Sequence, residues 1–236
     1  MLLAREGAHG VCICGRNMGN GERVVRALRA AGAAALYVQA DLGSAADCAR
    51  VVAAADAEWG RVDGLVNCAA ATTRSTWEDA TVEHMDALYA LNFRAPFLLT
   101  QAAYKVMKRV GRGGSIVNIG SVNGYGGISI LPVYSSLKGA LHTMTKNAAY
   151  AFRNDRVRVN CIAVGWMATP AEHEVMTKHH GRPETWLRDA DAAHPFGRIL
   201  RPPDIAKMAV HLLSDDAELQ TGSVVDIHEQ HFGCWD

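Results

Sequence analysis

The sequence lacks a surplus of either charge and any long apolar run. Its 24 Lys and Arg residues balance 24 Asp and Glu residues, and it has neither a basic run nor a basic patch interleaved with aromatics. Nucleic acid is therefore not an expected partner. Apolar stretches are too short for a membrane span, and the opening "MLLAREGAHG" is too short and too charged for a signal peptide. These absences argue against a membrane partner and favour a cytoplasmic protein.

The cysteines and histidines do not form a metal-binding pattern. None of the cysteine spacings is that of a zinc site, and most cysteines lie in apolar, strand-like runs, so we expect buried, reduced thiols. The six cysteines are Cys12, Cys14, Cys48, Cys68, Cys161 and Cys234. His173, His179 and His180 lie in a polar, loop-like region, where solvated side chains are more common than metal ligands. No metal site is predicted.

What the sequence does contain is a regular alternation of apolar runs and helical stretches. The apolar runs, interpreted as buried strands, are "GVCIC", "ALYVQ", "RVDGLVN", "GSIVNIG", "RVRVNCIAV" and "GSVVDI". The helical stretches are Glu22–Ala31, Ala45–Glu58, Val82–Arg109, Val133–Phe152 and Pro203–Leu213. Such an alternation implies right-handed crossovers and a parallel sheet covered by helices on both faces. The predicted fold is a single doubly wound, Rossmann-like α/β domain spanning 1–236, with the aperiodic segment 169–198 as a substrate lid or insertion.

The stretch "VCICGRNMGNGERVV" raises a question of its own. A strand, a glycine turn and a helix follow one another there, which is the arrangement that binds a pyrophosphate on helix-terminal N–H groups. Asp41 lies twenty residues after Gly21, where an acidic residue would bind a ribose hydroxyl. Local pattern alone leaves open whether this is a dinucleotide loop.

The residues with catalytic potential are concentrated in "GSIVNIGSVNGYGGISILPVYSSLKGAL". Tyr134 and Lys138 are four residues apart on a predicted helix, so both project from one face. An ammonium beside a phenol favours the phenolate and would lower the tyrosine pKa, which suits proton exchange with an alcohol. Ser121 follows a strand at the carboxyl edge of the sheet, where ligands bind in open α/β folds. Taken alone, the Tyr–Lys pair is equally typical of a helix surface.

Several further motifs accompany this pair. Ser121 lies thirteen residues before the tyrosine of "YSSLK", and "RVRVNCIAVGWMATP", "DGLVNCAA", "LNFRAPF" and "GRILRPPDIAKMAVHLLSDDAELQTGSVVDI" complete the set. With these motifs the chain resembles the short-chain dehydrogenase/reductase family over essentially its whole length. The resemblance implies that Tyr134 is the catalytic acid/base and that Ser121 orients the substrate oxygen. It further implies that Lys138 lowers the Tyr134 pKa and binds the nicotinamide ribose, while Asn92 holds the backbone and water of a proton relay.

The resemblance also implies a register for the first strands. In the family, the Asp of a "DL" pair follows the third strand and contacts adenine, and it precedes the "NNAG" element by about the distance from Asp41 to Asn67. "GVCIC" would then be the second strand, and "CGRNMGNG" a turn at the adenosine end rather than the pyrophosphate loop.

The family's central first strand and its TGxxxGxG loop would, in this register, precede Met1. The strand order of the family is 3-2-1-4-5-6-7, so the slot between the second and fourth strands would otherwise be empty, closed or filled by another segment. We expect a chain without this loop to bind the dinucleotide at least about a hundredfold more weakly than one extended upstream by about twenty residues.

Other family elements are altered. "NNAG" is replaced by Asn67-Cys68-Ala69-Ala70, the Pro of a "PG" pair by Val164, and the "DGG" near the C-terminus by "DIHEQ" from Asp226, which puts the usual tail contacts between subunits in doubt. The residues that the resemblance assigns to the dinucleotide are Arg16, Asp41, Leu42, Asn67, Ala69, Tyr134, Lys138, Val164, Gly165, Met167 and Thr169. Arg16 stands where an acidic residue would repel a 2′-phosphate, which favours NADP over NAD. A solvated arginine in a turn is the alternative.

The resulting hypothesis is an NAD(P)-dependent oxidoreductase that interconverts a secondary alcohol and a ketone, with Tyr134 exchanging the hydroxyl proton. A catalytically silent subunit or binding module, and a lyase or epimerase using the same site, stay open as alternatives. The residues expected around the substrate, in a polar pocket of about the size of a sugar, are Ser121, Asn123, Tyr134, Trp166 and Trp186.

The two longest predicted helices suggest an assembly. They carry apolar residues on more than one face, namely Leu88, Phe97, Leu98, Leu141 and Met144. In similar proteins these helices pair across a two-fold axis, which implies a homodimer or homotetramer. Burial within one subunit is the alternative.

Overall fold

Six parallel strands form the centre of the molecule in the computed structural model, which describes residues 1–228. They are β1 (Gly10–Gly15), β2 (Ala34–Gln39), β3 (Gly64–Asn67), β4 (Gly114–Ile119), β5 (Val157–Val164) and β6 (Val224–Ile227). Each corresponds to one of the apolar runs, and all pairings are parallel. The predicted doubly wound α/β fold is therefore confirmed. Cys234 and the end of "DIHEQ" lie outside the described residues.

The helices follow the predicted stretches closely. They are α1 (Leu2–Arg5), α2 (Met18–Ala30), α3 (Ala45–Trp59), α4 (Val82–Tyr89), α5 (Ala95–Val110), α6 (Pro132–Phe152), α7 (Pro170–Glu174), α8 (Trp186–Ala192) and α9 (Pro202–Leu213). Side-chain caps explain several starts: Asn17, Ser44 and Thr81 each accept a hydrogen bond from a backbone N–H in the first turn that follows. Within residues 1–228, no helix combines the length and the apolarity needed to cross a bilayer.

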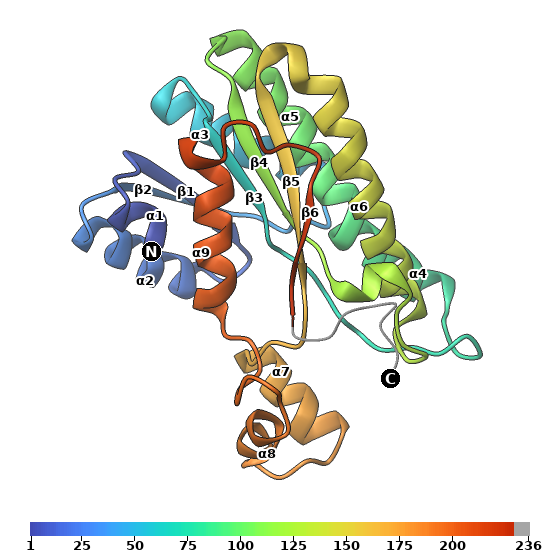
Figure 1. Ribbon diagram of the computed structural model, residues 1–236. Coiled ribbons are helices and arrows are strands. Elements are labelled where there is room, and N and C mark those ends of the chain that lie inside the picture. Colours follow the sequence, from blue (N-terminus) through green and yellow to red (C-terminus); the bar gives the residue numbers. More distant parts are fainter. Residues whose placement is uncertain (229–236) are drawn as a thin grey trace.

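The strands are divided between two sheets. β1 pairs only with β2, while β3, β4, β5 and β6 form a second sheet in that order, and no hydrogen-bonded ladder joins β1 to β3 within the described residues. Figure 1 shows β1 and β2 beside the larger sheet, with α9 in front of it. A first strand of the family type would lie beside β3. The pairing of β1 with β2 alone agrees instead with "GVCIC" as a second strand.

The glycine turn after β1 has an explanation in packing. Asn17 Oδ1 accepts a hydrogen bond from Asn20 N at 2.9 Å, so the N-terminus of α2 is capped by this side chain. Tyr37 on β2 donates its hydroxyl to Gly15 O at 2.6 Å, and a methyl group on Gly21 would overlap the Tyr37 ring. The glycine at position 21 therefore makes room for a tyrosine, which supports the interpretation of "CGRNMGNG" as a turn at the adenosine end.

Helices cover both faces of the larger sheet. On one face, α5 and α6 bury Ala103, Met107 and Ala148 against Ile116 and Val159. On the other face, α9 buries Ile205, Ala209 and Leu212 against Val117 and Ile162. These two layers fix the strands so that all their carboxyl ends lie at one edge, at the bottom of Figure 1.

The segment 169–198 extends beyond that edge and contains α7 and α8 (Figure 1). Its base is fixed by Asp191, whose carboxylate accepts hydrogen bonds from Arg201 Nη2 at 2.6 Å and from Ile199 N at 2.9 Å. A parallel bridge between Met167 and Leu200 joins the two ends of the segment. It therefore lies where a lid over the carboxyl edge is expected.

Candidate active site

Tyr134, Lys138 and Ser121 meet at the carboxyl edge of the sheet. Pro132 at the first position of α6 starts the helix that carries the tyrosine and the lysine. Ser121 lies just after β4 and begins a 3₁₀ turn, its Oγ accepting from Asn123 N at 3.2 Å. Ser121 is close enough to Tyr134 for its side chain to lower the tyrosine pKa, and Lys138 Nζ lies 5.6 Å from the centre of the Tyr134 ring. The structure thus brings together three of the four residues predicted to be catalytic.

Asn92 lies in a π-helical turn, Ala90–Arg94, that joins α4 to α5. The turn directs a fully buried amide away from the helix, and single π turns of this kind are frequent at functional sites. Asn92 Nδ2 donates to Ala71 O, and its Oδ1 accepts from Ala71 N, both at 2.9 Å. Asn92 therefore holds the backbone that follows β3, and its part in a proton relay stays a prediction.

A hydrogen-bonded series of buried polar side chains lies next to the site. Asn67 Nδ2 donates to Asn118 Oδ1 at 2.8 Å, and Asn118 Nδ2 donates to Thr145 Oγ1 at 2.9 Å. These hydrogen bonds tie β3, β4 and α6 together, so they fix the elements that carry the candidate catalytic residues. Asn118 and Thr145 were not predicted, although an asparagine within the buried strand "SIVNIG" was a usable signal.

The pKa of Tyr134 lies above its ordinary value, the reverse of the predicted direction. Burial of the phenol is the larger cause, and the hydrogen bond with Ser121 offsets part of it. Burial likewise lowers the pKa of Lys138, to about 8, although the lysine still donates to Ile119 O at 2.6 Å. Tyr134 is therefore a protonated phenol at neutral pH and Lys138 is predominantly an ammonium.

The residues expected to bind a dinucleotide lie along the same edge. Arg16, Asp41 and Leu42 follow β1 and β2, whose carboxyl ends are adjacent because Gly15 pairs with Gln39. Asp41 and Arg16 are exposed, and Asp41 Oδ1 is engaged by Gly43 N at 2.9 Å. Together they form the end of the row that would lie beside the adenosine.

The other end of this row lies at the carboxyl ends of β5 and β3. Val164 ends β5 and Gly165, Met167 and Thr169 follow it, and Thr169 Oγ1 caps α7 by accepting from Glu172 N at 3.0 Å. Asn67 ends β3, and its buried Oδ1 has no hydrogen-bond partner among residues 1–228. Ala69 follows on exposed backbone. An unpartnered buried acceptor and a buried lysine suit a ligand with ribose hydroxyls, so the residues at this end fit a nicotinamide dinucleotide.

The two tryptophans predicted to contact the substrate lie in and beside the lid. Trp186 is buried and donates from Nε1 to His173 Nδ1 at 3.0 Å. Trp166 stacks on it with ring centres 5.6 Å apart and donates to Glu172 Oε1 at 2.8 Å. The pair stiffens the lid, and a role for either ring in substrate contact stays a prediction.

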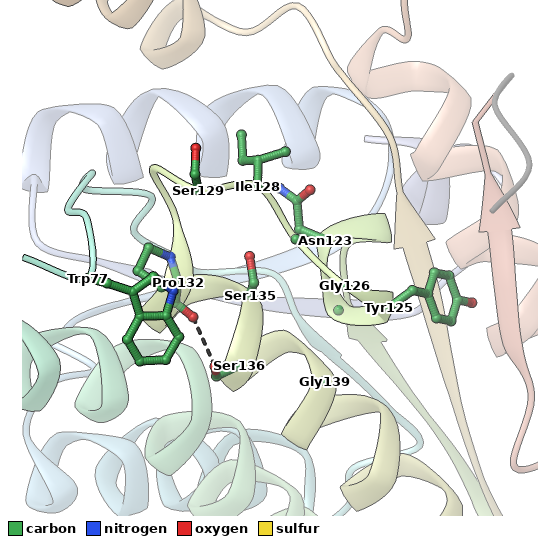
Figure 2. Close-up of a pocket in the computed structure, with 12 residues that line it drawn as sticks. Trp77, Asn123, Tyr125, Gly126, Ile128, Ser129, Pro132, Ser135, Ser136 and Gly139 are labelled. Carbon is green, nitrogen blue, oxygen red and sulfur yellow. Dashed lines mark hydrogen bonds between the residues drawn. The ribbon is translucent and has the colours of Figure 1, made fainter. Parts of the chain in front are cut away.

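A cavity of about 380 Å³ lies beside the first turns of α6. Figure 2 shows Asn123, Ser135 and Ser136 around it, with Trp77 as an exposed wall. Asn123 is the one predicted substrate residue in this lining, and Tyr134 is not part of it. Trp77 was not predicted, because an isolated tryptophan in a polar loop gives no local signal.

One thiol differs from expectation. Cys48 and Cys161 are buried and Cys12 and Cys14 are partly buried, but Cys68 is exposed. It follows β3 directly and lies just outside the predicted strand "RVDGLVN", which ends at Asn67 as β3 does.

Known proteins are similar to this chain in sequence and in fold. The family model described as enoyl-(acyl carrier protein) reductase matches residues 1–228. The 2-(S)-hydroxypropyl-CoM dehydrogenase 3 of Xanthobacter autotrophicus is 33% identical, with 93% of this chain and 85% of that protein covered. The NADP-dependent (R)-specific alcohol dehydrogenase of Lentilactobacillus kefiri is 32% identical, with 95% and 87% covered.

A solved structure gives the same result. A short-chain type dehydrogenase/reductase from Mycobacterium ulcerans superposes with a TM-score of 0.83 at 28% identity, covering 95% of this chain and 82% of that one. Sequence relatives, family model and fold agree over nearly the whole described chain. The chain therefore belongs to the short-chain dehydrogenase/reductase family, whose dehydrogenases use NAD(P), and is an oxidoreductase of that family.

Proposed function

We propose that this chain interconverts a secondary alcohol and a ketone. The observation that carries the proposal is the meeting of the Ser121 and Tyr134 side chains beside the buried Lys138, at the edge of the sheet where ligands bind. The secondary alcohol in the name of the Xanthobacter relative and the alcohol dehydrogenase activity in that of the Lentilactobacillus relative support the same substrate class.

Tyr134 handles the proton of the reaction. In reduction its hydroxyl gives a proton to the ketone oxygen, and in oxidation its phenolate takes the proton of the alcohol. Ser121 Oγ holds the same substrate oxygen, so the reacting atom lies between two hydroxyls. The Lys138 ammonium stabilises the phenolate that remains after reduction, because the two groups lie on one face of α6. Asn92 fixes the backbone of Ala71 at the mouth of the site.

NAD(P) supplies or accepts the hydride at C4 of its nicotinamide ring when bound. Lys138, Asn67 and the backbone at Val164–Thr169 would hold the nicotinamide and its ribose. At the other end, Asp41 and Leu42 would contact the adenine, and Arg16 would pair with a 2′-phosphate. NADP is the preferred cofactor in this proposal because Arg16 is exposed at the end of β1, with no acidic residue at its position.

Substitution of the tyrosine tests this function directly. The purified chain is assayed with NADP⁺ or NAD⁺ and secondary alcohols such as 1-phenylethanol and cyclohexanol, by the absorbance of the reduced nicotinamide. Tyr134→Phe should abolish turnover and leave dinucleotide binding within about threefold, since the phenol is a proton donor and not a main binding group. Tyr150→Phe, an exposed tyrosine on the same helix, is the matched control. Activity of Tyr134→Phe within about tenfold of wild type would refute the assignment.

The chain is further proposed to form a homodimer or homotetramer through α4, α5 and α6. Of the apolar residues first assigned to this face, Leu88, Leu141 and Met144 are buried within the subunit, so they cannot contact a partner. Other side chains are therefore proposed for the contact between subunits. Exposed apolar residues follow one another at helical spacing along α4 and α5, and Tyr150 is exposed on α6; the residues are Val82, Met85, Tyr89, Phe97 and Tyr150. This stripe is the proposed contact.

A further inference from the structure

α6 presents a third polar side chain next to its two catalytic candidates. His142 follows Lys138 by one turn and Tyr134 by two turns, so all three project toward the same side of the helix. The imidazole is 7% exposed, and its Nε2 has no hydrogen-bond partner in the part of the chain that the structure describes. An unpartnered buried nitrogen lowers stability. Stability of the fold therefore does not explain why an imidazole is present here.

The edge of the His142 ring lies against the turn that carries Ser121. A methyl group on Gly120 would lie 2.8 Å from Nε2, and one on Gly124 would lie 2.6 Å from Cε1 and 3.0 Å from Nδ1. Glycine at these two positions, directly before Ser121 and three residues after it, allows the backbone to approach the ring this closely. The backbone is so close that neither a larger ring at position 142 nor a side chain at position 120 or 124 would fit.

A third residue of the turn completes the contact. The Tyr125 ring packs on the imidazole with centres 5.1 Å apart, and the Tyr125 hydroxyl donates to the Asp226 carboxylate on β6. Gly124 N donates to Ser121 O at 2.9 Å, which closes the turn above the ring. The turn therefore contacts His142 through Gly120, Gly124 and Tyr125, and it contacts β6 through the Tyr125 hydroxyl.

We infer that His142 is a positioning residue that holds Ser121 in register with Tyr134. The basis is geometric: α6 meets the Ser121 turn through the Tyr134 side chain, through close backbone packing of Lys138 and Gly139 on Gly124, and through the His142 ring. The ring is the side-chain contact that reaches both glycines flanking Ser121, so removing it loosens the turn relative to the phenol. Ser121 Oγ then no longer meets the substrate oxygen in the orientation that Tyr134 needs.

A double-mutant cycle tests this inference, which rests on the proposed function. His142→Ala, Ser121→Ala and the double variant are compared for kcat with 1-phenylethanol and NADP⁺. If His142 acts through Ser121, His142→Ala should lower kcat about tenfold or more in the wild-type background and less than about threefold in the Ser121→Ala background. The Kd for NADP⁺ should stay within about threefold throughout. His211→Ala, an exposed histidine on α9, is the control.

A second variant guards against misfolding. His142→Leu removes the unpartnered nitrogen and keeps an apolar filling, which offsets the cost of fitting a branched side chain, so it should fold with a Tm near that of wild type. It should still show the loss in kcat, because a branched side chain is thicker than a flat ring and displaces the turn. Equal losses in both backgrounds, or a His142→Leu enzyme with wild-type kcat, would overturn the inference. Activity that survives Tyr134→Phe would instead refute the proposed function, so the two failures are distinguishable.

Discussion

Substitution of Gly21 by alanine tests whether the glycine turn after β1 serves packing or phosphate binding. Gly21 is buried within α2, and an alanine methyl there would overlap the Tyr37 ring. The ring cannot easily move away, because its hydroxyl is tethered to Gly15 O at 2.6 Å. Overpacking of this kind costs about 1–3 kcal/mol, and breaking the tether adds about 1 kcal/mol.

The helix propensity of alanine offsets part of this cost. Alanine is favoured over glycine within a helix by about 1 kcal/mol. We therefore expect Gly21→Ala to lower the free energy of unfolding by about 2 kcal/mol, or the Tm by roughly 4–8 °C for a chain of this size. Differential scanning calorimetry measures this shift.

Two comparisons make the test specific. A methyl on Gly19 of the same helix would meet nothing closer than Asn17 Oδ1 at 3.6 Å, so Gly19→Ala should be neutral or stabilising. In a Tyr37→Val background, where the ring is gone, Gly21→Ala should change sign and become stabilising by up to about 1 kcal/mol. A Gly21→Ala protein of normal stability that binds NADP⁺ more than about tenfold more weakly would show that the turn is a phosphate loop and that the assigned register is wrong.

Three further predictions concern the cofactor, the lysine and the assembly. Arg16→Ala should raise the Kd for NADP⁺ about tenfold and leave that for NAD⁺ unchanged, measured by calorimetric titration against Arg26→Ala as a control; equal effects on both dinucleotides would contradict the phosphate contact. Burial lowers the pKa of Lys138 to about 8, so the buried ammonium lowers the free energy of unfolding. This destabilisation is fully present below pH 8 and fades as the pH rises towards 10.5, the pKa of a lysine in the unfolded chain. Lys138→Met should accordingly gain Tm relative to wild type at pH 7 and lose that gain by pH 10.5, and a constant difference would argue against it. Phe97→Asp should convert the oligomer to monomers in light scattering, whereas a wild-type monomer at micromolar concentration would refute the assembly.

Most of the fold was predictable because the six strands and the longer helices each have a local signal. Apolar runs rich in Val and Ile alternate with amphipathic stretches, and this pattern depends only on neighbours in sequence. The prediction was least accurate where tertiary contacts determine the ends of an element. "RVDGLVN" shortens to β3 at Gly64–Asn67, because its pairing with β4 begins only at Gly64, opposite Ser115.

The candidate site was predictable in composition but not in arrangement. The spacing of Tyr134 and Lys138 placed both on one face of a helix, and the family motifs supplied Ser121 and Asn92. No sequence pattern indicated the π turn around Asn92, since a single extra residue in a helical turn leaves the apolar periodicity almost unchanged. His142 was likewise missed, because its partners Gly120 and Gly124 are ordinary turn glycines until the helix is placed beneath them.

The pKa of Tyr134 shows why arrangement matters for mechanism. From sequence, a lysine four residues away predicts a lowered value, since only the charge is visible. In the fold, helix packing also removes the phenol from water, and this burial is the largest cause of the raised pKa. Tyr134 is therefore protonated at neutral pH, which in the proposed function suits reduction of a ketone, whereas oxidation requires the proton to leave first. A bound oxidised nicotinamide would bring positive charge that favours this loss, so we expect the direction of proton transfer to depend on which redox form of the dinucleotide is bound.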